Sequence, residues 1–456
     1  MLVDTHCHLD FKDFDEDRDD VVDRAKKAGV VRIINVGSSI EGTRHSIELA
    51  KRYDIVYASI GVHPHEAKLV TDNIIADFRK LAEDKKVVAI GEVGLDYFRN
   101  LSPKEEQVAA FVKFIHLALD VNLPLIIHAR QADKDVLDIL HREIKGGING
   151  VMHCFSGDRD FLKECLDLGL FVSFTCNLTF KNAKGLKDVA RSVPVERLLL
   201  ETDAPFLAPQ EFRGKRNEPA YLAYLVDEWS HILGLSKDDV VRITAHNANK
   251  LFKLNMEEKT AKIAYRIRDS LYLNITNRCT NACDFCIRNQ TRFVKGHNLK
   301  LDREPSGDEI LKAIGDPARY REIVFCGYGE PTLRLDVIKA VSKELKNQGA
   351  KVRVVTNGHG DLINSRPIAG ELVGLVDKVS VSLNADSEAK YNDICKPDFG
   401  AKTYEHILDF IKACVSNNIE TEVTCLDLAG VDTGKCKNIA ESLGAGFRLR
   451  SKGVVG

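Results

Sequence analysis

The sequence predicts an α/β protein in which an N-terminal (β/α)8 barrel is followed by a partial (β/α)6 barrel. Two observations predict this fold. Short apolar runs alternate with longer amphipathic stretches along the chain, and most of the apolar runs are continuous. Continuous apolar runs are typical of parallel strands that are buried on both faces. At about 150 residues per domain, a chain of 456 residues is expected to form two or three domains.

Eight candidate strands are expected within residues 1–254. They begin near Leu2, Val31, Ile55, Val87, Leu123, Ile148, Leu170 and Arg197. Charged segments with helical periodicity separate them, for example residues 102–120. Eight strand–helix units in about 250 residues match the size of a (β/α)8 barrel, in which the C-terminal ends of all strands meet at one mouth.

The second half repeats this pattern after a charged connector, which we assign to residues 255–267. Six candidate strands are expected within residues 268–456. They begin at Ser270, Glu322, Lys351, Asp377, Glu420 and Gly446. Six strands with crossover helices between them predict an open, partial barrel.

The charge balance and the apolar pattern narrow the classes of protein. Lys and Arg number 65 and Asp and Glu number 67, so a uniformly basic surface is excluded and any contact with nucleic acid has to come from local patches. No apolar run approaches the ~18 residues that cross a bilayer, and the first residues lack the basic and apolar segments of a signal peptide. We therefore expect a cytoplasmic protein without membrane contact, and the sequence leaves its oligomeric state open.

Six residues of metal-ligand type stand at or near the ends of the N-terminal strands. His6 and His8 are two residues apart on the first strand, so both side chains point to the same face. The other four follow later strands: Glu92, His128, His153 and Asp203. A lone histidine at a strand end is usually a satisfied polar residue. Six such residues at one mouth exceed one tetrahedral site and suit two divalent ions bridged by a carboxylate.

Other residues near the same mouth have two interpretations each. His63 and His65, in GVHPH, would line the pocket, or they belong to a loop that proline stiffens. Arg213, Lys215 and Arg216 follow the eighth strand, where they bind a phosphate backbone or form a solvated charged run. The residues alone leave these alternatives open.

Seven motifs in residues 1–254 resemble those of the TatD deoxyribonuclease family. They are DTHCHLD, GVHPH, GEVGLDY, HCFSG, ETDAPFLAP, RGKRNEP and HNANKLF. The resemblance implies a metal-dependent hydrolase on a TIM barrel with two divalent ions, either Mg, Mn or Zn. The implied ligands of one ion are His6, His8, Glu92 and Asp203, and those of the other are Glu92, His128 and His153, with Glu92 as the bridge.

The implied reaction is hydrolysis of a phosphodiester or ester bond. Asp203 would take a proton from the attacking water, and the ions would stabilise charge on the phosphoryl oxygen. The resemblance favours substrate contacts by His63, Arg213 and Arg216, and a nucleic acid or nucleotide as substrate. Deoxyribonuclease activity and removal of an aminoacyl group from transfer RNA are both known in the family and both stay open.

Three cysteines stand close together in the second half. Cys279, Cys283 and Cys286 are spaced Cys-x3-Cys-x2-Cys after a candidate strand. Three thiolates on one loop can hold three irons of a [4Fe–4S] cluster and leave the fourth iron open. Zinc is the alternative, although a structural zinc site needs four ligands and usually two Cys-x2-Cys pairs. We interpret the other cysteines of this half as buried or surface thiols: Cys326, Cys395, Cys414, Cys425 and Cys436.

The three cysteines, with Phe285 before the last of them, resemble the signature of the radical S-adenosylmethionine (SAM) superfamily. The resemblance covers residues 268–456. It implies a [4Fe–4S] cluster and S-adenosylmethionine as cofactors, with Phe285 near the cofactor and an external electron donor for the cluster. The implied reaction is reductive cleavage of S-adenosylmethionine to a 5′-deoxyadenosyl radical that attacks a substrate the sequence does not identify.

The segment CGYGEPT resembles the superfamily's loop that receives the methionine amino group. Tyr328 replaces the first glycine of the usual doublet, whereas Gly329 and Glu330 remain. Asn357 and Asn384 stand at strand ends, where they contact S-adenosylmethionine or are plain turn residues. The chain as a whole resembles TatD-associated radical SAM proteins, so we expect a bifunctional enzyme. The alternative is that one half is a catalytically silent binding module.

Overall fold

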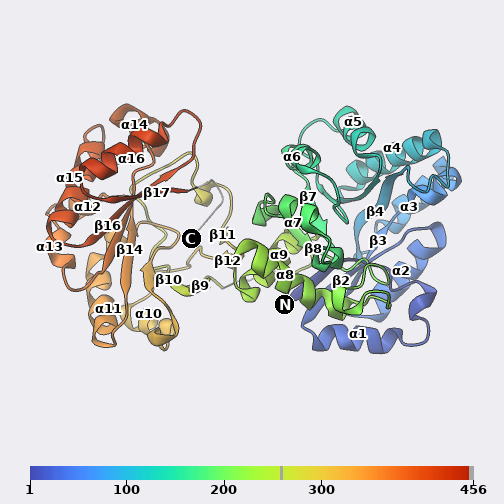
Figure 1. The fold of residues 1–456 in the computed structure, drawn as a ribbon, viewed down its shortest axis with the longest axis horizontal. Coiled ribbons are helices and arrows are strands. Elements are labelled where there is room, and N and C mark those ends of the chain that lie inside the picture. The colour runs from blue at the N-terminus through green and yellow to red at the C-terminus, as the bar shows by residue number, and fades with distance from the viewer. Residues whose placement is uncertain (257–259, 451–456) are drawn as a thin grey trace. The chain divides into compact units, whose positions relative to one another are not determined.

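The computed structural model of the chain describes residues 1–256 and 260–450. The chain divides into two compact units, Met1–Glu257 and Glu258–Gly456 (Figure 1). Residues 257–259 of the expected connector and residues 451–456 of the expected second domain lie outside the described residues.

The N-terminal unit is a barrel of eight parallel strands, as the sequence predicts. The strands are β1 (Leu2–Cys7), β2 (Val30–Val36), β3 (Val56–Ile60), β4 (Val87–Asp96), β5 (Leu125–Arg130), β6 (Gly150–Met152), β7 (Phe171–Phe174) and β8 (Leu198–Leu200). Each strand pairs in parallel with the next one along the chain. A parallel bridge between Cys7 and Ala204 joins the two ends of the sheet. The C-terminal ends of the strands therefore surround one mouth.

The helices of this unit follow the strands and pack against them. They are α1 (Arg18–Lys27), α2 (Ile40–Arg52), α3 (Asp72–Leu81), α4 (Lys104–Val121), α5 (Asp133–Glu143), α6 (Arg159–Asp167), α7 (Lys184–Ala190), α8 (Leu222–Leu233) and α9 (Lys237–Phe252). Polar caps define where several of them begin: Ser39 accepts a hydrogen bond from the backbone N–H of Gly42, and Ser236 accepts one from that of Asp239. Phe114 of α4 and Trp229 of α8 are fully buried in the core that these helices form with the strands.

A second apolar cluster fills the barrel interior. Val3, Ile126 and Leu199 of the strands pack in it with Leu251 and Phe252 at the end of α9. These strand residues precede the polar residues of the same strands in the sequence. The end of the barrel where the strands begin is therefore apolar, and the polar side chains of the interior gather at the mouth.

The C-terminal unit is built on a seven-stranded sheet in the order β17-β16-β15-β14-β13-β10-β9. Six strands are parallel, as the sequence predicts: β10 (Ser270–Leu273), β13 (Ile323–Phe325), β14 (Val352–Thr356), β15 (Lys378–Ser382), β16 (Glu420–Leu426) and β17 (Gly446–Arg450). The seventh strand, β9 (Ala264–Ile267), comes from the segment that we expected to be connector and pairs antiparallel with β10. A two-residue turn at Arg268, whose φ is +55°, brings the chain back on itself. The sheet ends at β9 and β17, so it is an open barrel.

Helices cover one face of this sheet (Figure 1). They are α10 (Gly307–Ile314), α11 (Leu335–Asn347), α12 (Gly360–Asn364), α13 (Ala369–Leu372), α14 (Glu388–Cys395), α15 (Thr403–Ser416) and α16 (Thr433–Ser442). A short hairpin of β11 (Phe293–Val294) and β12 (His297–Asn298) follows the cysteine loop. In both described parts of the chain, every helix is too short or too polar to cross a bilayer.

Candidate functional site

The mouth of the N-terminal barrel brings together all six of the predicted metal-ligand residues. His6 and His8 lie at the end of β1, Glu92 in β4, His128 in β5, His153 directly after β6 and Asp203 after β8. His6 is fully buried, and Glu92 and His153 are 4% and 6% exposed. Residues up to 197 positions apart in the sequence thus share one small buried space because parallel strands end at the same side of a barrel.

Glu92 faces a different pair of histidines with each of its carboxylate oxygens. Its Oε1 lies 2.7 Å from His128 Nδ1 and 2.8 Å from His153 Nε2. Its Oε2 lies 3.5 Å from His6 Nε2 and 3.7 Å from His8 Nε2. A carboxylate with one oxygen in each of two donor groups has the arrangement of a bridging ligand.

Asp203 completes the first donor group. Its Oδ1 lies 3.7 Å from His6 Nε2 and 3.6 Å from His8 Nε2, and these two nitrogens are 3.2 Å apart. In the second group, His128 Nδ1 and His153 Nε2 are 3.1 Å apart. Each group therefore points at least two imidazole nitrogens and one carboxylate oxygen at a common point.

Two observations show that this donor set fits metal ions. Ring nitrogens that approach to 3.1–3.2 Å in a buried space repel one another unless a proton or a cation lies between them. Imidazoles mixed with carboxylates form a borderline to hard donor set, which suits divalent ions such as Zn, Mn or Mg.

The local electrostatics keep the carboxylates ionised. Burial by itself would raise the pKa of Glu92, but His153, His63 and His128 hold that pKa well below its usual value. Burial would likewise raise the pKa of Asp203, but the hydrogen bond with His8 and the proximity of His6 lower it. The two ionised carboxylates supply the negative charge that a divalent cation needs.

The mouth contains further polar residues that the sequence analysis did not single out. Asp96 Oδ2 lies 3.0 Å from His65 Nε2 and 3.5 Å from His128 Nε2. Glu201 Oε1 lies 3.5 Å from His153 Nδ1, and Glu201 also accepts a hydrogen bond of 2.6 Å from Ser173 Oγ. Such carboxylates orient the histidines. The sequence could have indicated both residues, because Asp96 ends β4 and Glu201 follows β8 directly.

The predicted substrate contacts fall at different places. His63 lies at the mouth, where its Nε2 is 3.7 Å from Glu92 Oε1. Arg216 donates two hydrogen bonds of 2.7 Å to Asp17, so its charge is already paired. Arg213 is exposed and stacks over the ring of Phe180 at 4.6 Å, without an ion pair in the described part of the chain.

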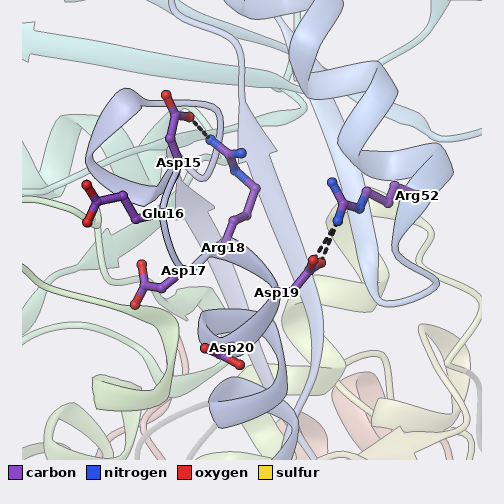
Figure 2. Close-up of a pocket in the computed structure, with 7 residues that line it drawn as sticks. All are labelled: Asp15, Glu16, Asp17, Arg18, Asp19, Asp20 and Arg52. Carbon is purple, nitrogen blue, oxygen red and sulfur yellow. Dashed lines mark hydrogen bonds and ion pairs between the residues drawn. The ribbon is translucent and has the colours of Figure 1, made fainter.

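A surface pocket of about 320 Å³ is lined by Asp17, the partner of Arg216, and by none of the predicted metal-ligand residues. Figure 2 shows its lining: residues 15–20 and Arg52. Arg18 pairs with Asp15 and Arg52 with Asp19, which leaves an excess of carboxylates. An acidic hollow of this kind repels phosphate, so we do not place a nucleic-acid substrate there.

The C-terminal unit places the three predicted cluster cysteines on the loop after β10. Cys279, Cys283 and Cys286 are half-buried. Among the described residues, no set of three thiols comes within 4.8 Å of one another.

Two side chains, those of Arg288 and Cys395, contact the cysteines of this loop. Arg288 Nε donates to Cys286 Sγ at 3.4 Å, and Arg288 also donates to the backbone carbonyls of Asn277 and Asn281. Cys395 was expected to be a bystander; it is buried at the end of α14, and its hydrogen bond with Cys283 lowers the pKa of the Cys283 thiol.

The predicted S-adenosylmethionine contacts lie on the loops that follow β13, β14 and β15, except for Phe285, which lies on the cysteine loop after β10. The buried Glu330 carboxylate accepts hydrogen bonds from Thr356 Oγ1 at 2.8 Å and from the backbone N–H of Asn357 at 2.7 Å. A Cβ at Gly329 would overlap the backbone carbonyl of Arg278, so this position needs glycine.

The other three predicted contacts, Asn357, Asn384 and Phe285, each have different neighbours. Asn357 Nδ2 donates to Thr280 Oγ1 at 3.0 Å, which connects it to the cysteine loop. Asn384 accepts from the backbone N–H of Leu426, and Phe285 packs against the apolar core.

The first unit thus has the architecture of a metal-dependent hydrolase on a (β/α)8 barrel. The family model described as TatD related DNase matches residues 3–253, and the model of the radical SAM superfamily matches residues 273–441. The chain therefore belongs to the TatD related DNase family and carries a radical SAM domain after the hydrolase domain. Both memberships indicate an enzyme, and both expected resemblances are confirmed.

Similar proteins match the first unit over their full length. The uncharacterized metal-dependent hydrolase YabD of Bacillus subtilis is 43% identical over 255 residues, which are 56% of this chain and 100% of that protein. The 3′-5′ ssDNA/RNA exonuclease TatD of Pantoea ananatis is 36% identical over 261 residues, again 56% of this chain and 100% of that protein. The crystal structure of YJJV, a TatD homologue from Escherichia coli, is 30% identical, with a TM-score of 0.52 over 55% of this chain and 98% of that one.

Proposed function

We propose that the N-terminal unit hydrolyses phosphodiester bonds of nucleic acid with the help of two divalent ions. His6, His8 and Asp203 would hold one ion, and His128 and His153 the other. The observation that carries the proposal is the position of Glu92, whose two oxygens face the two donor groups separately.

The residues of the mouth have distinct roles in this reaction. Bound divalent ions supply Lewis-acid activation of the water and of the phosphoryl group. Asp203 Oδ1 faces His6 and His8, so Oδ2 is the atom that accepts the proton of the attacking water. Asp203 is ionised and so free to accept a proton, because His8 and His6 lower its pKa, and its side chain keeps 14% of its surface exposed. The apolar filling of the barrel beneath keeps bulk water out from below.

A nucleic acid is the substrate that we favour, because the relative from Pantoea ananatis is named as an exonuclease of single-stranded DNA and RNA. The test is cleavage of end-labelled single-stranded DNA and RNA by the full chain with Mn, Mg or Zn, with and without a chelator. Cleavage that the chelator stops is the expected result. Release of the amino acid from an aminoacyl-RNA with no cleavage of either polymer would contradict it and indicate a deacylase instead.

We propose further that the C-terminal unit binds a [4Fe–4S] cluster through Cys279, Cys283 and Cys286 and cleaves S-adenosylmethionine reductively. Their Cys-x3-Cys-x2-Cys spacing in the sequence supports a cluster over a single zinc ion, which usually takes two Cys-x2-Cys pairs. Arg288 would stabilise thiolate charge, because it already donates to Cys286 Sγ. Iron and sulfide analysis after anaerobic reconstitution, together with formation of 5′-deoxyadenosine, tests this role. Binding of about one zinc and no iron would contradict it.

A further inference from the structure

An exposed aromatic ring stands directly beside the candidate metal centre. Phe206 follows Asp203 by three residues and is 51% exposed. Its ring centroid lies 6.5 Å from that of His8 and 6.0 Å from that of Phe11. Phe11 in turn stacks on His8, with centroids 4.7 Å apart and planes inclined by 22°. Two phenylalanine rings therefore flank one proposed metal ligand, and one of them is open to solvent.

The exposed ring sits on a backbone that the fold holds in place. The buried Asn217 donates from Nδ2 to the carbonyl of Phe206 at 2.7 Å and to that of Thr202 at 2.8 Å. Its backbone N–H donates to the carbonyl of Pro205 at 2.9 Å. Single exposed apolar residues are common on protein surfaces. Phe206 differs because the buried Asn217 amide anchors the loop on both sides of Asp203. The Phe206 ring and the Asp203 carboxylate are therefore positioned together.

The same connection between β8 and α8 carries two positive charges that each lie over an aromatic ring, Arg213 over Phe180 at 4.6 Å and Lys215 over Phe212 at 6.0 Å. Arg213 and Lys215 are exposed, and in the described part of the chain neither forms an ion pair. Their neighbour Arg216, by contrast, is paired with Asp17. Exposed cations beside an aromatic surface are the combination that proteins use to bind single-stranded nucleic acid.

We propose that Phe206, backed by Phe11, stacks on an unpaired nucleobase next to the scissile phosphate, while Arg213 and Lys215 contact neighbouring phosphates. The inference rests on the proposed hydrolase function and assigns to Phe206 the contact with a base that is free to leave its neighbours, in a single strand or at a frayed end. Because every base has a π-face, the contact selects for an unpaired base and against none of the four.

The test compares two oligomers of equal length: oligothymidylate and a chain of the same sugars and phosphates without bases. Binding to the full chain is measured by fluorescence anisotropy in excess chelator, so that no cleavage occurs. Wild type is expected to prefer the oligomer with bases. Phe206→Ala is expected to weaken its binding by about 5- to 100-fold, which corresponds to the loss of one stacked base. The ratio of the affinity for oligothymidylate to the affinity for the oligomer without bases should then approach one.

Two further variants make the result specific. Phe206→Trp should restore the preference, because the larger ring still stacks. Leu119→Ala, at a side chain of α4 that is 52% exposed, is the matched control and should leave the preference unchanged. An unchanged preference in Phe206→Ala would overturn the proposal. Equal loss of both oligomers would also overturn it, because it would show that Phe206 only shapes the loop.

Cleavage of the same oligomers with divalent metal separates this inference from the function on which it rests. A wild type that prefers bases in binding but hydrolyses neither oligomer contradicts the hydrolase proposal and leaves the stacking role supported. A wild type that hydrolyses oligothymidylate while Phe206→Ala keeps the full preference for bases supports the hydrolase and refutes the stacking role.

Discussion

The bridging position of Glu92 leads to the most specific prediction about the hydrolase. Glu92→Gln keeps the shape of the side chain and one oxygen, but it removes the negative charge. In the structure Oε1 lies 2.7 Å from His128 Nδ1 and Oε2 lies 3.5 Å from His6 Nε2. A neutral amide offers only one acceptor atom, so it cannot serve both groups. We expect the variant to lose at least one of two bound divalent ions and most of its hydrolytic activity.

The size of the effect follows from the burial of this carboxylate. Two unit charges about 4 Å apart interact by about 4 kcal/mol at an effective dielectric constant of ~20. Glu92 is 4% exposed, so water does not screen it further. At 1.36 kcal/mol for each tenfold change in rate, a loss of about 4 kcal/mol in the transition state lowers kcat/KM roughly 10³-fold.

Metal content and oligonucleotide cleavage are measured on the same preparations. Glu83→Gln, an exposed glutamate just beyond α3, is the matched control and should behave as wild type. Thermal unfolding of each variant shows whether the barrel has folded. Full turnover by folded Glu92→Gln with two ions still bound would refute the bridging role.

Three further predictions concern other parts of the chain. Burial lowers the pKa of His359 to about 4. As the pH falls, the unfolded chain therefore takes up a proton at this histidine before the folded chain does. The free energy of unfolding of the C-terminal unit is full above pH ~6.5 and falls by up to about 3 kcal/mol as the pH drops toward 4. Denaturant midpoints of wild type and His359→Gln measure this loss, and a wild type as insensitive to pH as the variant would contradict it. Arg216 holds the pKa of Asp17 at about 2, so this pair stabilises the fold above pH ~4 and loses its effect as the pH falls toward 2. Because both side chains are about 30% exposed, Arg216→Ala should cost less than about 1 kcal/mol of unfolding free energy in urea titrations at neutral pH. Cys283→Ala should remove iron, sulfide and the electron paramagnetic resonance signal of the reduced protein, whereas Cys414→Ala, on the buried face of α15, should keep all three; equal iron in both variants would count against the cluster.

The sequence by itself determined what depends on local spacing. Continuous apolar runs indicated parallel strands, and both sheets have them. The two-residue spacing of His6 and His8 required their side chains to share a face, because side chains alternate along a strand. The position of Asp203 just beyond a predicted strand placed it at the mouth once a barrel was assumed. These inferences need only the period of a strand and the rule that parallel strands end on one side.

The tertiary structure decided which side chains meet. Arg213 and Arg216 look alike in the sequence, yet only Arg216 reaches Asp17, a residue 199 positions away. The two oxygens of Glu92 are divided between two histidine pairs, and Cys395 lies against Cys283 across 112 positions. Such contacts depend on how the barrel closes and how each loop returns over the strand ends. Local periodicity sets the face of a side chain but carries no information about a partner that the closed sheet brings to it.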